Sequence, residues 1–107
     1  MTIEDFVLSL AQSQPPERLS KLLEALWYDG KKDWEAAHNI AQEIETSEGS
    51  LIHAYLHRKE GDSGNASYWY RKAGRAVPDV SLEEEWKQIA TELLNAQKSN
   101  AKHQANT

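Results

Sequence analysis

The 107-residue sequence contains no cysteine, which excludes disulfide bonds, thiolate metal sites and cysteine nucleophiles. No apolar run approaches the ~20 residues that a membrane-spanning helix requires. No segment alternates between apolar and polar residues with the period of two that is typical of a half-buried strand. The first residues, MTIEDF, are acidic and lack the basic-then-apolar layout of a secretion signal. Together these absences favour a cytoplasmic, all-α protein without a membrane partner.

The chain also lacks the basic excess of a dedicated nucleic-acid-binding protein, because its net charge is −5. With 39% hydrophobic and 27% charged residues, it has the composition of a globular protein with one modest core. Its positive charge is concentrated locally, since residues 58–75 carry five Lys or Arg against two acidic residues. A basic surface on an acidic protein suits a carboxylate-bearing peptide or a small anion better than a duplex.

Apolar residues recur at helical spacing in six segments that are separated by turn signals. Thr2 is a candidate N-cap for the first helix, and Pro16 is a candidate first residue of the second. Ser50 is the predicted cap of the fourth helix, and Gly61 and Gly74 are predicted to end the fourth and fifth. The expected fold is therefore an all-α bundle of about six short helices.

The last predicted helix begins with a capping box formed by Ser81 and Glu84. Its apolar stripe ends near Gln97, and the chain then reads KSNAKHQANT, which is polar and aperiodic. We therefore expect a single helical domain over residues 1–97 and a polar, disordered tail over residues 98–107.

Short helices joined by small turns can indicate an internal repeat. One set of residues falls at the spacings of the tetratricopeptide pattern: Ser50, His53, Ala54, His57, Ala66, Tyr70 and Pro78. An upstream set fits the same pattern with one extra residue in the turn: Leu19, Leu22, Leu23, Leu26, Ala37 and Ala41. The chain therefore resembles two tetratricopeptide-like helical hairpins, which implies a leading helix before them and a C-terminal capping helix after them.

The stretch HAYLHRKEGD…NASYWYRKAG also resembles a family of short uncharacterised helical proteins, and this resemblance implies no activity. Two repeats are fewer than the ~3 that a stable array needs, so we expect a closed bundle. The chain departs from the tetratricopeptide pattern at His53 and His57, where the pattern has large apolar and aromatic residues. These two histidines are therefore candidates for a site.

His53 and His57 are four residues apart and share one face of a helix. Such a pair can hold a divalent metal ion, with Glu60 as an additional oxygen ligand. Because the glutamate of the zinc-protease motif is missing, histidines hydrogen-bonded inside the hairpin are the favoured interpretation, and an anion site or a metal site is the alternative. If His38 approaches the pair, three imidazoles converge and the metal interpretation gains weight. The expected walls of this candidate site are Trp34 and Tyr68.

The basic residues Arg58, Lys59 and Arg71 form a second candidate site. Arg offers a planar fork to a carboxylate and Lys a point charge, while tyrosines add rings and hydroxyls. The opposing interpretation is a solvated face whose cations pair with Glu60, Asp62 or Asp29. The predicted ligand-binding groove consists of Tyr55, Arg58, Lys59, Tyr70 and Arg71.

The sequence has no recognisable Ser–His–Asp set, phosphate-binding glycine loop or paired acid motif. An enzyme is therefore disfavoured, and no catalytic residue and no cofactor is predicted. The first hypothesis is a non-catalytic helical interaction module that binds an acidic peptide or protein through the groove. The alternative is a small-molecule, anion or metal site centred on His53, His57 and His38. The four tryptophans are expected in the core, and the capping helix favours a monomer or weak dimer.

Overall fold

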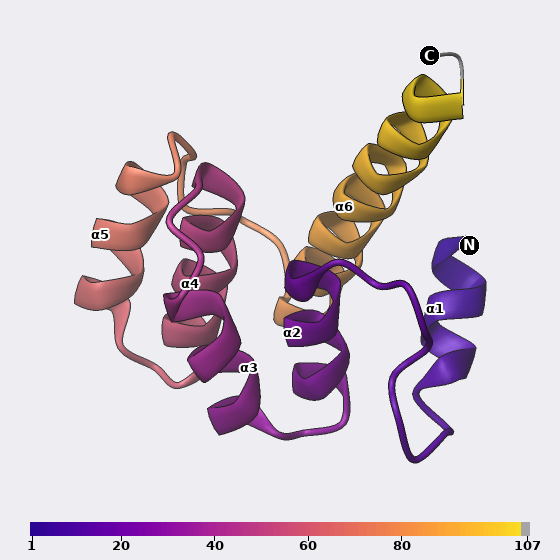
Figure 1. Ribbon diagram of the computed structural model, residues 1–107. Coiled ribbons are helices and arrows are strands. Elements are labelled where there is room, and N and C mark those ends of the chain that lie inside the picture. Colours follow the sequence, from indigo (N-terminus) through magenta and orange to yellow (C-terminus); the bar gives the residue numbers. More distant parts are fainter. Residues whose placement is uncertain (106–107) are drawn as a thin grey trace.

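The described part of the chain is entirely helices and connecting turns. The computed structural model describes residues 1–105, with side chains described as far as residue 98, and no strand occurs within this range. This confirms the predicted all-α fold (Figure 1). The six helices of the described residues are α1 (Ile3–Ser9), α2 (Lys21–Gly30), α3 (Trp34–Gln42), α4 (Ser47–Lys59), α5 (Ser63–Lys72) and α6 (Leu82–Ala105).

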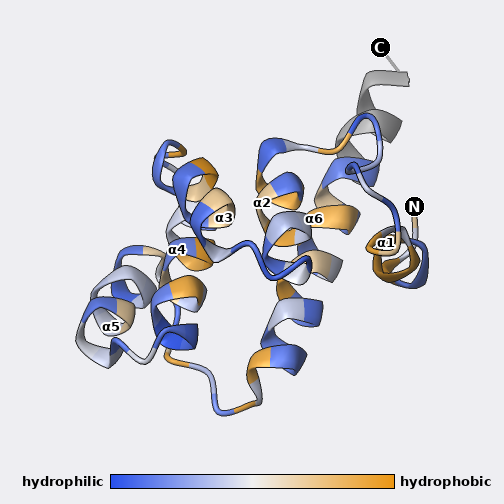
Figure 2. Ribbon diagram, turned by 90° about the horizontal axis from the view of Figure 1, so that it is seen from below, coloured by the Kyte–Doolittle hydropathy of each residue, from blue (hydrophilic) through white to orange (hydrophobic). Residues whose placement is uncertain are grey.

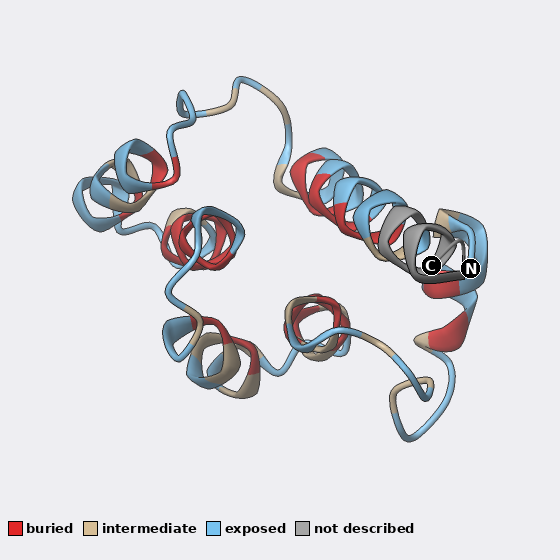
Figure 3. Ribbon diagram, turned by 45° about the horizontal axis from the view of Figure 1, so that its top comes forward, coloured by how far each residue is buried: buried red, intermediate tan, exposed pale blue. Residues whose placement is uncertain are grey.

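Helix α4 is the centre of the fold. Helices α2, α3, α4 and α5 pack in chain order, each against the next, and α6 returns to pack on α2 and α4 while α1 covers α6 (Figure 1). Figure 3 shows buried residues on every side of α4. Its buried residues form one unbroken run, residues 49–57, which includes two histidines. Because buried polar groups require partners, those histidines must be satisfied from within the fold.

The core of the described residues is formed by apolar side chains from all six helices. Two tryptophans lie within it as predicted: Trp27 donates its indole N–H to Ser9 Oγ at 3.1 Å, and Trp86 donates to the carbonyl oxygen of Leu26 at 3.0 Å. Hydrophilic residues predominate in the turns and on the outer helix faces (Figure 2). None of the helices within the described residues combines the length and the apolar character needed to cross a membrane. The largest fully buried apolar or aromatic side chains are Trp27, Tyr70, Phe6, Leu23, Leu26, Ile52 and Leu56.

Several predicted helix boundaries are confirmed. Thr2 forms a capping box with Asp5 at the start of α1. Gly61 and Gly74 follow α4 and α5 with φ of +87° and +74°, a conformation that glycine adopts without a steric penalty. Ser81 accepts a hydrogen bond from the backbone N–H of Glu84, as expected for the start of α6.

Three boundaries differ from the prediction. Helix α2 begins after Ser20, which caps it, and not at Pro16. Helix α4 is capped by Thr46, whose hydroxyl accepts from Gly49 N–H at 3.0 Å, so Ser50 lies inside the helix. Helix α6 continues past residue 97 to residue 105, where a polar tail was predicted, because its Ala, Lys and Gln residues favour helix. Residues 106–107 of the predicted tail lie outside the described residues.

Gly49 lies in the first turn of α4, against the backbone of the α3–α4 connection. A Cβ atom at Gly49 would lie 2.1 Å from the carbonyl oxygen of Ile44, so the connection would have to move. We expect Gly49→Ala to lower the free energy of unfolding by about 2 kcal/mol in chemical denaturation.

Gly64 provides the matched control, because it also lies in the first turn of a helix but has open space around it. The nearest atom to a Cβ at Gly64 is an oxygen of Asp62 at 4.0 Å. We expect Gly64→Ala to raise the free energy of unfolding by about 0.5 kcal/mol. Equal effects of the two substitutions would contradict the steric explanation.

Candidate functional site

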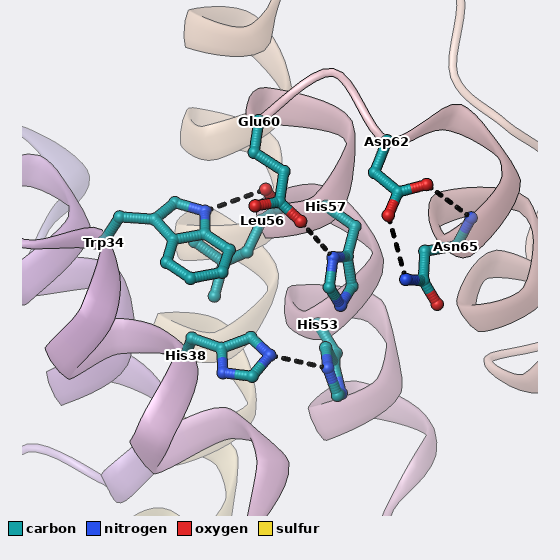
Figure 4. A network of polar contacts seen from close by, with 8 residues as sticks. All are labelled: Trp34, His38, His53, Leu56, His57, Glu60, Asp62 and Asn65. Atoms are coloured by element: carbon teal, nitrogen blue, oxygen red, sulfur yellow. Dashed lines mark hydrogen bonds and ion pairs between the residues drawn. The ribbon is translucent and has the colours of Figure 1, made fainter.

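Three histidines from two helices converge where α3 packs against α4 (Figure 4). His38 comes from α3, and His53 and His57 come from successive turns of α4. The Nε2 atoms of His38 and His53 are 3.0 Å apart, and one ring nitrogen from each of the three residues lies within 4.8 Å of the others. We call these residues the histidine cluster. The approach of His38 to the α4 pair, which the sequence left conditional, is therefore found.

A carboxylate fixes the orientation of one ring in the histidine cluster. Nδ1 of His57 lies 2.6 Å from Oε1 of Glu60, which is the C-cap residue of α4 (Figure 4). When His57 donates its Nδ1–H to this carboxylate, its Nε2 keeps a lone pair. A histidine that binds a metal ion commonly has this arrangement, with the second nitrogen held by a carboxylate.

Two tryptophan rings form the walls of the histidine cluster. Trp34 stacks on His38, with ring centroids 4.8 Å apart, and donates its indole N–H to the carbonyl oxygen of Leu56. Trp69 stacks on His53 at 4.0 Å. The sequence predicted Tyr68 in place of Trp69, but Tyr68 is exposed and contacts the edge of Trp69. Adjacent residues on a helix point about 100° apart, so the rotation of α5 against α4 decides which of them reaches the cluster.

The surroundings of His38 and His53 favour neutral imidazoles. His53 and His57 are 8% and 9% exposed. Burial lowers the pKa of His53 to about 4, and the positive charges of His38, His57 and Lys72 act in the same direction. The pKa of His38 is also lowered, first by burial and then by His57. Neutral imidazoles are the form that binds metal ions.

The spacing of the histidine cluster fits a tetrahedral metal ion. A Zn–N bond of ~2.0–2.1 Å places two tetrahedral nitrogen ligands about 3.3 Å apart. The distances within the cluster, 3.0 Å at the closest and 4.8 Å at most, lie on either side of that value. Small side-chain rotations would therefore complete the site. The hydrogen shared between the two facing Nε2 atoms would have to leave, because each of these nitrogens needs its lone pair for the metal.

Glu60 and Asp62 also lie near His57 as a group of possible ligands. Asp62, however, caps α5: one oxygen accepts the backbone N–H of Asn65 at 3.2 Å and the other its side-chain amide at 3.0 Å (Figure 4). Because both oxygens are used, the three imidazoles are the stronger ligand set.

The five residues of the predicted aromatic and basic groove do not line one surface: Tyr55 and Lys59 line a cavity of about 470 Å³, whereas Tyr70 and Arg71 line two separate hollows. The hydroxyl of Tyr55 donates to one oxygen of the buried Asp29 at 2.9 Å, and Lys59 Nζ contacts the other at 3.0 Å. The alternative that paired a basic residue with Asp29 is thus confirmed for Lys59. Burial and the neighbouring carboxylate raise the pKa of Tyr55. Arg71 is exposed on α5.

A second buried carboxylate, Glu85, holds the remaining groove residues. Arg58 donates to one of its oxygens at 2.8 Å and also to the carbonyl oxygen of Val80, and Tyr70 donates to the other oxygen of Glu85 at 2.6 Å. Burial and this hydrogen bond raise the pKa of Tyr70. The buried position of Glu85 could not be predicted from the sequence, because burial of a charge depends on partners from distant segments. Binding of an acidic partner stays a prediction, but not through this groove.

A cavity of about 480 Å³ adjoins the histidine cluster. It lies between the end of α3, the start of α4 and α5, and His53 forms part of its wall. The sequence did not predict this cavity, because its walls come from three segments of the chain. Its other lining residues include Ser50, Trp69 and Lys72.

In comparisons with known proteins, no family model, curated protein or solved structure matches this chain. The resemblance to tetratricopeptide hairpins and to the family of short helical proteins therefore stays a prediction. The function has to be inferred from the geometry of the histidine cluster.

Proposed function

We propose that the protein binds a divalent transition-metal ion through His38, His53 and His57. The observation that carries this proposal is the convergence of three imidazoles from two helices, with one ring nitrogen of each within 4.8 Å of the others. Imidazole ligands suit zinc, copper, nickel and iron. The chain contains no cysteine, which agrees with a metal site built from nitrogen ligands. The absence of cysteine also agrees with a reducing, cytoplasmic setting.

A purely structural hydrogen-bond network accounts less well for this arrangement. A buried histidine is normally satisfied by an acceptor, as His57 is by Glu60. His38 and His53 instead present the same nitrogen to each other at 3.0 Å. That contact needs one ring to donate and the other to accept, and it becomes repulsive when both are protonated. A metal ion would satisfy all three rings at once.

Three protein ligands also indicate the class of site. Structural zinc sites are almost always closed by four protein ligands, whereas sites that act on a ligand keep an open position. Glu60 is not counted as a ligand, because its carboxylate is hydrogen-bonded to Nδ1 of His57 and orients that ring. The proposed site therefore has a position left for water or a small molecule.

Zinc titration of the untagged, EDTA-treated and dialysed protein tests the proposal by calorimetry. We expect one ion per chain and stabilisation of the folded protein by ~2.7 kcal/mol when free zinc is at a hundredfold excess over its dissociation constant. His53→Ala and His57→Ala should abolish this stabilisation. Asn39→Ala is the matched control, because Asn39 is exposed on α3 next to His38, and it should leave zinc binding unchanged.

Glu60→Gln tests the supporting role of the carboxylate. We expect it to weaken zinc binding by about 10- to 100-fold while the stoichiometry stays at one. Folded wild-type protein that binds none of zinc, nickel and copper would refute the metal site. An unchanged affinity in Glu60→Gln would refute only the role of Glu60.

A second candidate function is the binding of an acidic peptide or protein. The observation that favours it is the outer face of α5, where Tyr68, Arg71 and Lys72 line a surface hollow of about 300 Å³. A labelled oligoglutamate peptide should bind the wild-type protein, and the charge reversal Arg71→Glu should abolish binding. Equal binding by both proteins would exclude this face as the docking surface.

A further inference from the structure

The cavity beside the histidine cluster has the size of a small-molecule site. Its volume of about 480 Å³ lies within the ~300–1,000 Å³ of ligand pockets. Because His53 belongs both to its wall and to the cluster, a metal ion on the cluster would lie at the edge of this cavity. The open coordination position would then be within reach of a molecule inside it.

The charges around the cavity favour an anion once a metal ion is bound. Lys72 and Glu45 are the charged residues of the described lining, and their charges cancel. A divalent metal ion bound to three neutral imidazoles contributes two positive charges, and the carboxylate of Glu60 balances one of them. One positive charge therefore remains without a partner.

Lys72 is placed to contact such an anion. Its Nζ lies 4.9 Å from the centroid of the Trp69 ring, and that ring stacks on His53. Among the described residues, Lys72 forms no ion pair within 4.0 Å. Its ammonium group can therefore turn to a ligand without breaking an existing bridge.

We propose, on the basis of the proposed metal site, that this cavity binds a small molecule with one carboxylate group. One carboxylate oxygen would occupy the open position on the metal, and the Lys72 ammonium group would donate a hydrogen bond to the other oxygen. The single excess charge matches a monoanion, and the lining has no Arg fork of the kind that recognises phosphate. Ala41, Ile44 and Trp69 are the apolar residues of an otherwise mostly polar lining, and they would contact the apolar part of a ligand.

Cobalt-substituted protein allows the two proposals to be tested separately. Co²⁺ binding is measured first by the visible absorption of the metal, and benzoate and acetate are then titrated into the loaded protein. We expect a saturable change in the cobalt spectrum, with benzoate binding more tightly than acetate because its ring would contact the apolar residues of the lining. Lys72→Gln should weaken benzoate binding by roughly tenfold or more without weakening Co²⁺ binding, because the lost positive charge acts against a cation at His53. Arg71→Gln is the matched control, since it removes the neighbouring cation, which is not part of the lining, and it should change neither affinity.

The possible outcomes distinguish the two proposals. If Co²⁺, zinc, nickel and copper all fail to bind, both the metal site and the carboxylate site are refuted. If Co²⁺ binds but neither carboxylate changes its spectrum, the carboxylate proposal is refuted and the metal site stands. A stronger response to inorganic phosphate than to benzoate, or equal benzoate affinity in Lys72→Gln and the wild type, would also overturn the carboxylate proposal.

Discussion

Replacing Arg58 by methionine should lower the free energy of unfolding by about 3 kcal/mol. The Glu85 side chain is only 4% exposed, and Arg58 supplies its cationic partner at 2.8 Å. Met fills part of the volume of the arginine side chain but leaves the carboxylate buried without a counter-charge. The hydrogen bond from Tyr70 to the other oxygen of Glu85 remains, but it does not neutralise the charge. Chemical denaturation of the metal-free protein at neutral pH measures the effect.

The exposed ion pair between Arg75 and Glu92 provides the matched control. The Arg75 guanidinium contacts both carboxylate oxygens of Glu92, at 3.3 and 2.8 Å, whereas Arg58 contacts only one oxygen of Glu85, so the exposed pair has the more complete geometry. The two side chains are 47% and 52% exposed, however, and solvent already screens the charges. Arg75→Met should therefore cost no more than about 0.5 kcal/mol. Similar losses in Arg58→Met and Arg75→Met would show that burial of Glu85 does not determine the effect.

The helices were predictable from the sequence because their signals are local. Thr2 caps α1 through residues only three positions away, and Gly61 and Gly74 end their helices through their own backbone conformation. The cap of α4 was mispredicted because Thr46 and Ser50 are both competent caps. Thr46 is the cap in the structure, because its hydroxyl accepts a hydrogen bond from Gly49 N–H. Gly49 also lies close to the α3–α4 connection, as expected for a residue in the first turn of α4.

The candidate site was predictable only in part, because some of its contacts join residues that are distant in the sequence. The spacing of His53 and His57 placed them on one face of a helix. Whether His38 reaches them depends on how α3 packs against α4, which the spacing within either helix does not encode. The burial of the Asp29 and Glu85 carboxylates was not predicted, because a charged residue is expected outside unless a distant partner neutralises it. These carboxylates pair with Arg58 and Lys59, so the two cations are already neutralised within the fold.

The stability of the metal-free protein should fall by up to about 3 kcal/mol as the pH decreases from 6.5 to 4. The unfolded chain protonates His53 near pH 6.5, whereas the folded protein protonates it at about 4 because of burial and the charges of His38, His57 and Lys72. Between these values the unfolded state binds more protons, so lowering the pH favours unfolding. The lowered pKa of His38 acts in the same direction. Denaturation series at several pH values in the presence of EDTA measure this dependence.

His53→Phe separates this histidine from the carboxylates that also titrate below pH 5. Phenylalanine keeps an aromatic ring against Trp69 but cannot bind a proton. The difference in unfolding free energy between wild type and variant should therefore change between pH 6.5 and 4 and be constant above pH 7. A difference that is the same at every pH would mean that His53 is not held neutral by the fold. Protons and metal ions compete for the same nitrogen, so the shift that destabilises the folded protein in acid also keeps His53 available to a metal ion below pH 6.5.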